Sequence, residues 1–110
     1  MGGMARRKGA VGQGIAANML RDRDYVVDQL TAGLSTGDII ATDANGKTWL
    51  VEVKNCASIT NAHLKQAIQQ GKDRRLPWML MQKIMGSSSW LVRKQGGIPA
   101  VWHEKEGEIG

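Results

Sequence analysis

The sequence predicts an α/β domain in which a mixed β-sheet is flanked by two helices. Three observations support this class: two stretches with apolar residues at helical spacing, several short segments rich in β-formers, and Gly or Pro between many of them. The chain has 110 residues, enough for one hydrophobic core and too few for two. We expect a flexible basic arm over residues 1–8, one domain over residues 9–103 and a polar tail over residues 104–110.

The first helix is predicted from about Gly9 to Asp22, because its apolar residues recur every three or four positions. Glycines weaken its first turns. A short strand is expected near Tyr25–Leu30 and a loop over 32–36. The apolar stripe of the helix consists of Val11, Ile15, Ala16, Met19 and Leu20.

A β-hairpin follows, with β-rich segments at 39–42 and 48–53 and the turn signal Asn45-Gly46 between them. A two-residue loop would place Asp38 opposite Val53. A three-residue loop over 44–46 would instead place Asp38 opposite Glu52. Both loops are common in hairpins, and glycine at the third loop position fits the longer one.

The second helix is predicted over 60–74, and Pro77 ends it. Strands are expected at 78–83, 90–94 and 100–102, separated by Gly86 with three serines and by Gly96-Gly97. The expected order is therefore α-β-β-β-α-β-β-β.

Composition and charge narrow the functional classes. Lys and Arg number 15 against 10 Asp and Glu, a net charge of +5, which suits a polyanionic partner such as nucleic acid as well as it suits simple solubility. A single cysteine, Cys56, excludes an internal disulfide and a cysteine-rich zinc site. No apolar run approaches the roughly 20 residues that span a bilayer. We expect a cytoplasmic protein with no membrane partner.

The hairpin carries the chemistry that stands out. Glu52 and Lys54 share one face of their strand, because side chains alternate along it. In the longer-loop register Asp38 joins them, and the Asp38 and Glu52 Cβ atoms lie roughly 4.5 to 5.5 Å apart. Two carboxylates at that spacing repel each other unless they share a proton or a cation, and Mg²⁺ prefers such oxygen ligands. The alternative is an ordinary solvent-facing hairpin with surface ion pairs.

Gly37-Asp38, a hairpin, Glu52-Val53-Lys54 and a following helix together resemble the PD-(D/E)XK nuclease superfamily, with glycine where the pattern names proline. The stretches RRKGAVGQGIAANML and HLKQAIQQGKDRRLPWMLMQK look like helices of small Holliday-junction-resolvase-like and phage-type (VRR-NUC-like) nucleases. The resemblance runs from about Lys8 to Val92. It implies a restriction-endonuclease-like core and, for the source, a phage or prophage.

The resemblance also implies a Mg²⁺-dependent endonuclease that hydrolyses DNA, with Mn²⁺ as a possible substitute and branched junctions as the favoured substrate. Asp38 and Glu52 would be metal ligands, and the Val53 carbonyl a third oxygen. Lys54 would be the catalytic lysine, and Gln66 would place phosphate or water. A homodimer or larger symmetric assembly is expected, because two sites related by a twofold axis can cut a junction symmetrically.

One position departs from the pattern. Related nucleases often carry a Glu on the first helix, where this chain has Gln13, which cannot be an anionic ligand. A catalytically weakened or inactive DNA-binding protein with the nuclease fold is therefore the main alternative, and a flap or single-strand nuclease is a third. The residues expected to contact phosphate are Arg6, Arg7, Lys8, Lys72, Arg74 and Arg75. His63 is expected on the exposed surface of the second helix.

Overall fold

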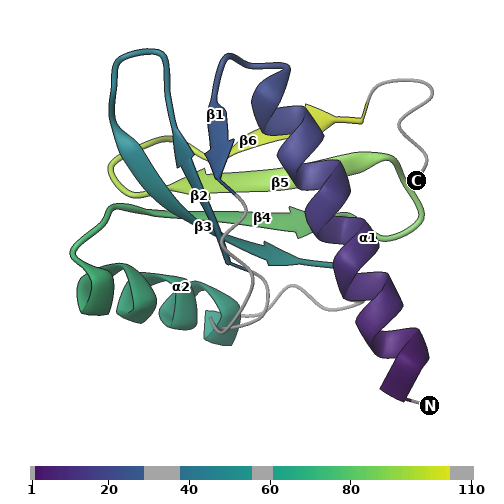
Figure 1. Ribbon diagram of the computed structural model, residues 1–110. Coiled ribbons are helices and arrows are strands. Elements are labelled where there is room, and N and C mark those ends of the chain that lie inside the picture. Colours follow the sequence, from purple (N-terminus) through teal and green to yellow (C-terminus); the bar gives the residue numbers. More distant parts are fainter. Residues whose placement is uncertain (1, 29–37, 56–60, 105–110) are drawn as a thin grey trace.

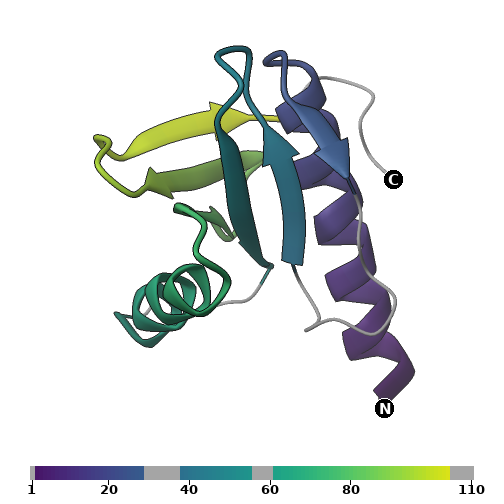
Figure 2. The ribbon, with the colours of Figure 1, turned by 60° about the vertical axis from the view of Figure 1, so that its left-hand side comes forward.

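The computed structural model describes residues 2–28, 38–55 and 61–104, with residues 2–11 and 38 described by their backbone alone. Within these ranges a six-stranded mixed sheet lies between two helices, which cover opposite faces (Figures 1 and 2). The elements are α1 (Gly2–Arg21), β1 (Val26–Asp28), β2 (Asp38–Thr42), β3 (Thr48–Lys54), α2 (Asn61–Arg74), β4 (Trp78–Lys83), β5 (Ser89–Lys94) and β6 (Ala100–His103).

This arrangement confirms the α/β class and the predicted element order. The strands lie in the sheet in the order in which they occur in the chain, from β1 to β6. All neighbouring pairs are antiparallel except β3 and β4, which are parallel and are joined through α2. Parallel neighbours require such a crossover, because the chain must return to the end of the sheet where the first strand began before the second strand can start.

The first helix is longer than the sequence indicates. It begins at Gly2 rather than near Gly9, so residues 2–8 form its first turns and not a separate arm. The predicted loop at 32–36 and Cys56 fall outside the described residues.

The main core lies between α1 and one face of the sheet. Alternate residues of the strands point to it, and α1 contributes the apolar stripe that its spacing predicts. Its largest fully buried members include Trp90, Met19, Leu20 and Met81. The opposite face is covered by α2, which approaches closely because Ala67 and Gly71 are small and buried. On this second face the sheet carries polar side chains as well as Leu50 and Leu80.

None of the described helices is long and apolar enough to cross a membrane.

Candidate active site

The β2–β3 turn sets the register that the candidate site needs. Asp43 donates its N–H to the carbonyl of Lys47 at 2.8 Å, which closes a three-residue loop, and Gly46 takes a φ of 84°. The Asp43 carboxylate accepts hydrogen bonds from the N–H groups of Asn45 and Lys47, each at 2.9 Å. Its other oxygen accepts from the Trp49 indole N–H at 3.1 Å. The turn is therefore fixed by its own side chain and by a glycine that tolerates the left-handed conformation.

The resulting register pairs position 38 with Glu52 across β2 and β3. This confirms the longer of the two loops considered for the sequence and rules out the pairing of position 38 with Val53. Directly paired residues of an antiparallel sheet share one face. Val53 points the other way and is buried in the core beneath α1.

Glu52 is buried, with 1% of its surface exposed. The Lys54 ammonium nitrogen lies 3.1 Å from Glu52 Oε1, and 24% of the Lys54 side chain is exposed. The pair thus connects a buried carboxylate to an amine at the protein surface. Buried ion pairs contribute little net stability, because desolvation offsets their attraction. A stabilising role therefore does not by itself explain this pair.

A second set of polar side chains lies beside this pair on β4 and β5. Gln82 is the neighbour of Lys54 in the parallel β3–β4 pair and is 1% exposed. In the next row Leu80 separates Glu52 from Arg93. Arg93 donates from Nη2 to Gln82 Oε1.

The same Gln82 amide reaches α2, where its Nε2 lies 3.3 Å from His63 Nδ1. Arginine is only a donor, so the Gln82 oxygen must face Arg93 and its NH₂ group must face His63. His63 Nδ1 is then the acceptor, which places the ring proton of the neutral imidazole on Nε2. The chain Arg93–Gln82–His63 thus fixes a tautomer on the helix that borders Lys54.

The structure corrects the expectation for His63 of α2 and leaves the role of Gln66 as a prediction. His63 is partly buried and bonded to β4, not a plain surface residue. Gln66 lies one helical turn further on and is exposed. Its suggested role at the site stays a prediction, and its exposure does not add support to it.

His63, Gln82 and Arg93 are the residues that sequence reasoning missed. A signal for Gln82 did exist, because it follows four apolar residues in β4 and its side chain lies on the same face of the strand as those of Trp78 and Leu80. His63 and Arg93 gave no such signal, because their contact depends on how α2 and β5 pack against β4.

The first helix approaches the site from the other side of the sheet. A Cβ placed on Gly12 would lie 2.9 Å from the Cβ of Asn55, the residue that follows Lys54. Position 13 is therefore next to a direct contact with the end of β3, and Gln13 is partly buried. Arg6, Arg7 and Lys8 lie in α1, and their side chains fall outside the described part of the structure.

The ligands that the proposed site would offer are oxygen atoms, the kind that Mg²⁺ prefers. In the part of the chain that the structure describes, no group of three or more His, Cys, Asp or Glu side chains could hold a metal ion. Mg²⁺ does not need such a cage, because it typically takes one or two carboxylates and completes its octahedron with water and substrate phosphate. The buried Glu52 opposite position 38 offers the kind of site that such an ion accepts.

The basic residues predicted after the second helix lie away from this site. Lys72 and Arg74 are in the last turn of α2 and Arg75 follows it, whereas His63 is near the first turn. They therefore occupy the opposite end of the same helix.

Comparison with known proteins does not assign the chain to a family. No family model matches it, and searches of curated proteins and of solved structures found no significant match.

Proposed function

We propose that the protein is a metal-dependent DNA endonuclease with a preference for branched substrates. The observation that carries the proposal is the register that sets position 38 opposite the buried Glu52, with Lys54 in contact with Glu52. A carboxylate pair with a neighbouring amine suits phosphodiester hydrolysis, in which negative charge must be both bound and stabilised. The net charge of +5 is consistent with a nucleic-acid substrate.

In the proposed reaction, water adds to phosphorus while the bond between phosphorus and the 3′ oxygen breaks, which leaves a 3′-hydroxyl and a 5′-phosphate. Bound Mg²⁺ or Mn²⁺ supplies positive charge at the phosphate. Asp38, Glu52 and the Val53 carbonyl are the proposed ligands. Lys54 stabilises charge on the phosphate oxygens and orients the attacking water.

His63 replaces Gln66 as the best candidate from α2 for a further role. Its Nε2–H is the donor at the end of the Arg93–Gln82–His63 chain. Gln82 pairs with Lys54 across β3 and β4, so a donor held by Gln82 could bind a phosphate oxygen near the lysine. Gln82 and Arg93 then act as positioning residues for the imidazole.

Cleavage of a four-way junction, a flap and a linear duplex tests the proposal, each with Mg²⁺, Mn²⁺ or EDTA. We expect metal-dependent cleavage, strongest on the junction, and at least about a hundredfold loss in Lys54→Ala and Glu52→Gln, because each removes charge that acts in the transition state. Cleavage in EDTA, or cleavage that survives Lys54→Ala, would contradict the mechanism.

Lys83→Ala is the matched control. Lys83 also forms an ion pair with a carboxylate, that of Glu104, and its side chain is 20% exposed, close to the 24% of Lys54. It lies at the end of β4 with its ammonium group above the Trp90 ring. Loss of this ion pair should leave cleavage close to that of the unchanged protein.

A non-catalytic DNA-binding role is the second candidate, because Gln13 stands where related nucleases often carry a Glu. Binding to the same DNA substrates without cleavage in either metal would favour this reading. A homodimer is proposed with either function, and sedimentation of the free protein and of its junction complex tests it. A single-protomer complex at saturating junction would exclude the symmetric-cut arrangement.

A further inference from the structure

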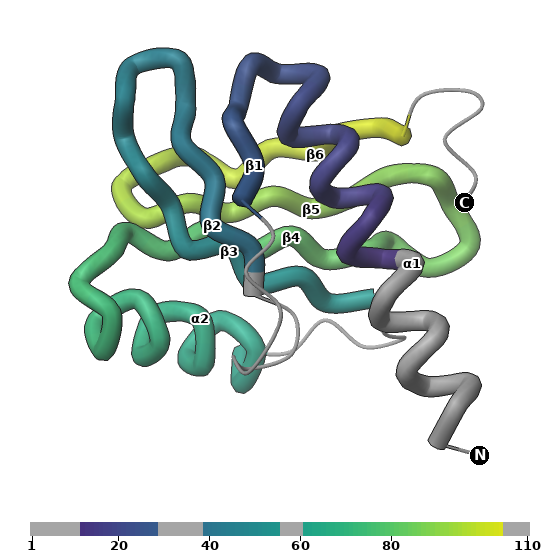
Figure 3. The backbone as a smooth tube through the Cα atoms, in the orientation of Figure 1, coloured from purple at the N-terminus to yellow at the C-terminus, as the bar shows by residue number. Residues whose placement is uncertain are grey.

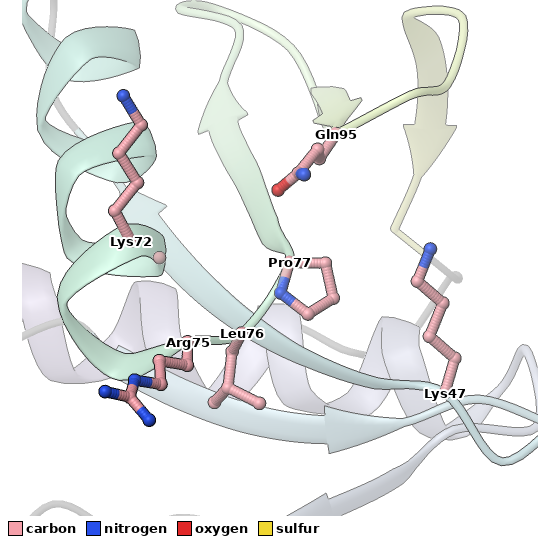
Figure 4. A pocket seen from close by; sticks show the side chains of 7 residues that line it. Lys47, Lys72, Arg75, Leu76, Pro77 and Gln95 are labelled. Atoms are coloured by element: carbon pink, nitrogen blue, oxygen red, sulfur yellow. The ribbon is translucent and has the colours of Figure 1, made fainter.

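A shallow hollow of about 410 Å³ lies at the end of the sheet where β3 and β4 begin (Figure 4). Lys47 borders it and directly precedes β3, while Lys54 is the last residue of that strand. Figure 3 shows the β2–β3 turn, the α2–β4 connection and the turn after β5 on the same side of the sheet. Leu76 and Pro77 contribute an apolar surface, and Gln95 lies above Pro77.

The charge of this hollow is strongly positive. Three of its residues, Lys47, Lys72 and Arg75, are cationic, and none of the described residues that line it is acidic. The nearest carboxylates in sequence are engaged elsewhere. Asp43 accepts the turn N–H groups, and Asp73 accepts a hydrogen bond from Gln69 at 2.9 Å.

The cationic groups are spread around the hollow and do not converge on one point. Figure 4 shows Lys47 and Lys72 on opposite sides of Pro77, and the Arg75 guanidinium turned toward the outer side. A small anion would need donors that converge on it. A chain of regularly spaced phosphates can meet separated cations one after another, so the spacing favours a polyanion.

The backbone of Arg75 is unusual for a residue that is not glycine. Arg75 has a φ of 57°, in the left-handed region that favours glycine. It closes α2 through the bonds from Leu76 N–H to Gly71 O at 2.9 Å and from Arg75 N–H to Lys72 O at 3.2 Å. Glycine is the usual residue at this position of the motif. An arginine here keeps a strained backbone and gains only its exposed side chain, which points away from that of Lys72 in Figure 4.

We propose that this hollow holds the sugar-phosphate backbone of a nucleic-acid strand, with Lys47, Lys72 and Arg75 on successive phosphates. The proposal rests on the proposed function in taking the strand to be the substrate cleaved at Lys54. The 14 residues of α2 span about 21 Å at 1.5 Å per residue. The hollow therefore engages the strand about six nucleotides from the scissile bond, at about 3.4 Å per nucleotide.

Fluorescence anisotropy with a labelled duplex of about 20 base pairs, in EDTA, tests the proposal without cleavage. Each of Lys47→Ala and Lys72→Ala should weaken binding about five- to tenfold near 0.1 M salt and lower the salt slope by about 0.9, because each removes one phosphate contact. Arg21→Ala is the charge-matched control. Arg21 is exposed at the end of α1, on the other side of the sheet, and its loss should change affinity less than about twofold.

Unchanged binding in Lys47→Ala and Lys72→Ala, or an equal loss in Arg21→Ala, would overturn the proposal. Competition with inorganic phosphate tests the alternative of a small-anion site. If phosphate displaces the duplex far more effectively than chloride does at equal ionic strength, the hollow binds small anions and not a nucleic-acid strand. Failure of the proposed function is distinguishable. If the protein binds DNA through the hollow but never cleaves it, this inference stands and the proposed nuclease function is wrong. If it cleaves DNA with a KM that Lys47→Ala and Lys72→Ala leave unchanged, the nuclease function stands and this inference is wrong.

Discussion

Gly12 of α1 and Asn55 at the end of β3 approach so closely that a Cβ on residue 12 would lie 2.9 Å from the Asn55 Cβ. This contact sets how near the first helix comes to the strand end that carries Lys54. It has a direct consequence for stability, because Asn55 Cβ is attached to backbone and cannot swing aside.

Gly12→Ala should destabilise the protein by about 1–2 kcal/mol, because the added methyl overpacks this contact. Gly14→Ala is the matched comparison in the same helix. No atom lies within 4 Å of a Cβ on Gly14, so the alanine there should stabilise by about 0.5–1 kcal/mol through helix propensity. Urea unfolding measures both, and stabilisation by Gly12→Ala would show that α1 does not sit where the structure places it.

Gln13→Glu tests whether the first helix reaches the candidate metal site. If position 13 adds a ligand, the new carboxylate should raise Mg²⁺ affinity and cleavage activity together, by about tenfold or more for one added ligand. Titration of cleavage against Mg²⁺ measures this. Asn18→Asp is the control, because Asn18 is exposed further along the same helix and its replacement adds the same charge. An equal gain in both variants would indicate general charge and not coordination.

Asp43 should make the hairpin sensitive to acid. The N–H of Lys47, then the indole N–H of Trp49, hold the pKa of this carboxyl below its ordinary value of 3.8. The native state therefore binds fewer protons than the unfolded state, so this stabilisation is present above pH 3.8 and is lost as the pH falls through the folded pKa. Asp43→Asn should be less stable at neutral pH and lose less stability on acidification. Unfolding midpoints between about pH 6 and pH 2 measure the difference, and parallel curves for the two proteins would refute it.

Arg75→Gly should stabilise the fold by about 1 kcal/mol and weaken DNA binding at the same time, because it relieves the left-handed backbone and removes a cation. Asp24→Gly is the natural comparison. Asp24 has a φ of 66° and closes α1 through the same pair of bonds, yet it lies outside the hollow. We expect the same gain in thermal stability from Asp24→Gly with no loss of DNA affinity. If both variants bind DNA more weakly, the loss comes from the change in backbone and not from the missing Arg75 cation, which would contradict the binding role of Arg75.

Gln82→Leu should lower the cleavage rate more than it lowers stability. It removes the partner of both Arg93 and His63 in a partly buried network, which costs about 1–3 kcal/mol. Nitrogen NMR of the imidazole provides a readout that a packing role alone would not move. His63 should carry its proton on Nε2 in the unchanged protein and should populate both tautomers in Gln82→Leu. A Nδ1–H tautomer in the unchanged protein would contradict the network.

The hairpin register shows how far local sequence signals reach. Gly46 at the third loop position favours a three-residue loop, and that loop sets the pairing of position 38 with Glu52. The signal is readable from the sequence because the loop type depends on a few adjacent residues. The structure confirms that pairing. Element types and most boundaries followed from periodicity for the same reason. The start of α1 did not, because Gly9, Gly12 and Gly14 suggested a late start.

The contacts between distant segments were beyond such signals. The bond from Gln82 to His63 joins residues 19 positions apart, and it requires α2 to lie at a particular height on β4. That height follows from the packing of Ala67 and Gly71, where small side chains allow close approach. A single sequence shows that these residues are small, but not which strand they meet.

The strictly sequential order of the strands divides the sheet into two three-stranded units, joined by the parallel contact between β3 and β4. Glu52 and Lys54 belong to the first unit, whereas Gln82 and Arg93 belong to the second. Each three-stranded unit can form from local contacts. Docking the two units requires the longer α2 crossover, so we expect it to be the slower event in folding. The proposed cleavage activity should therefore appear only with that docking step, after most of the secondary structure has already formed.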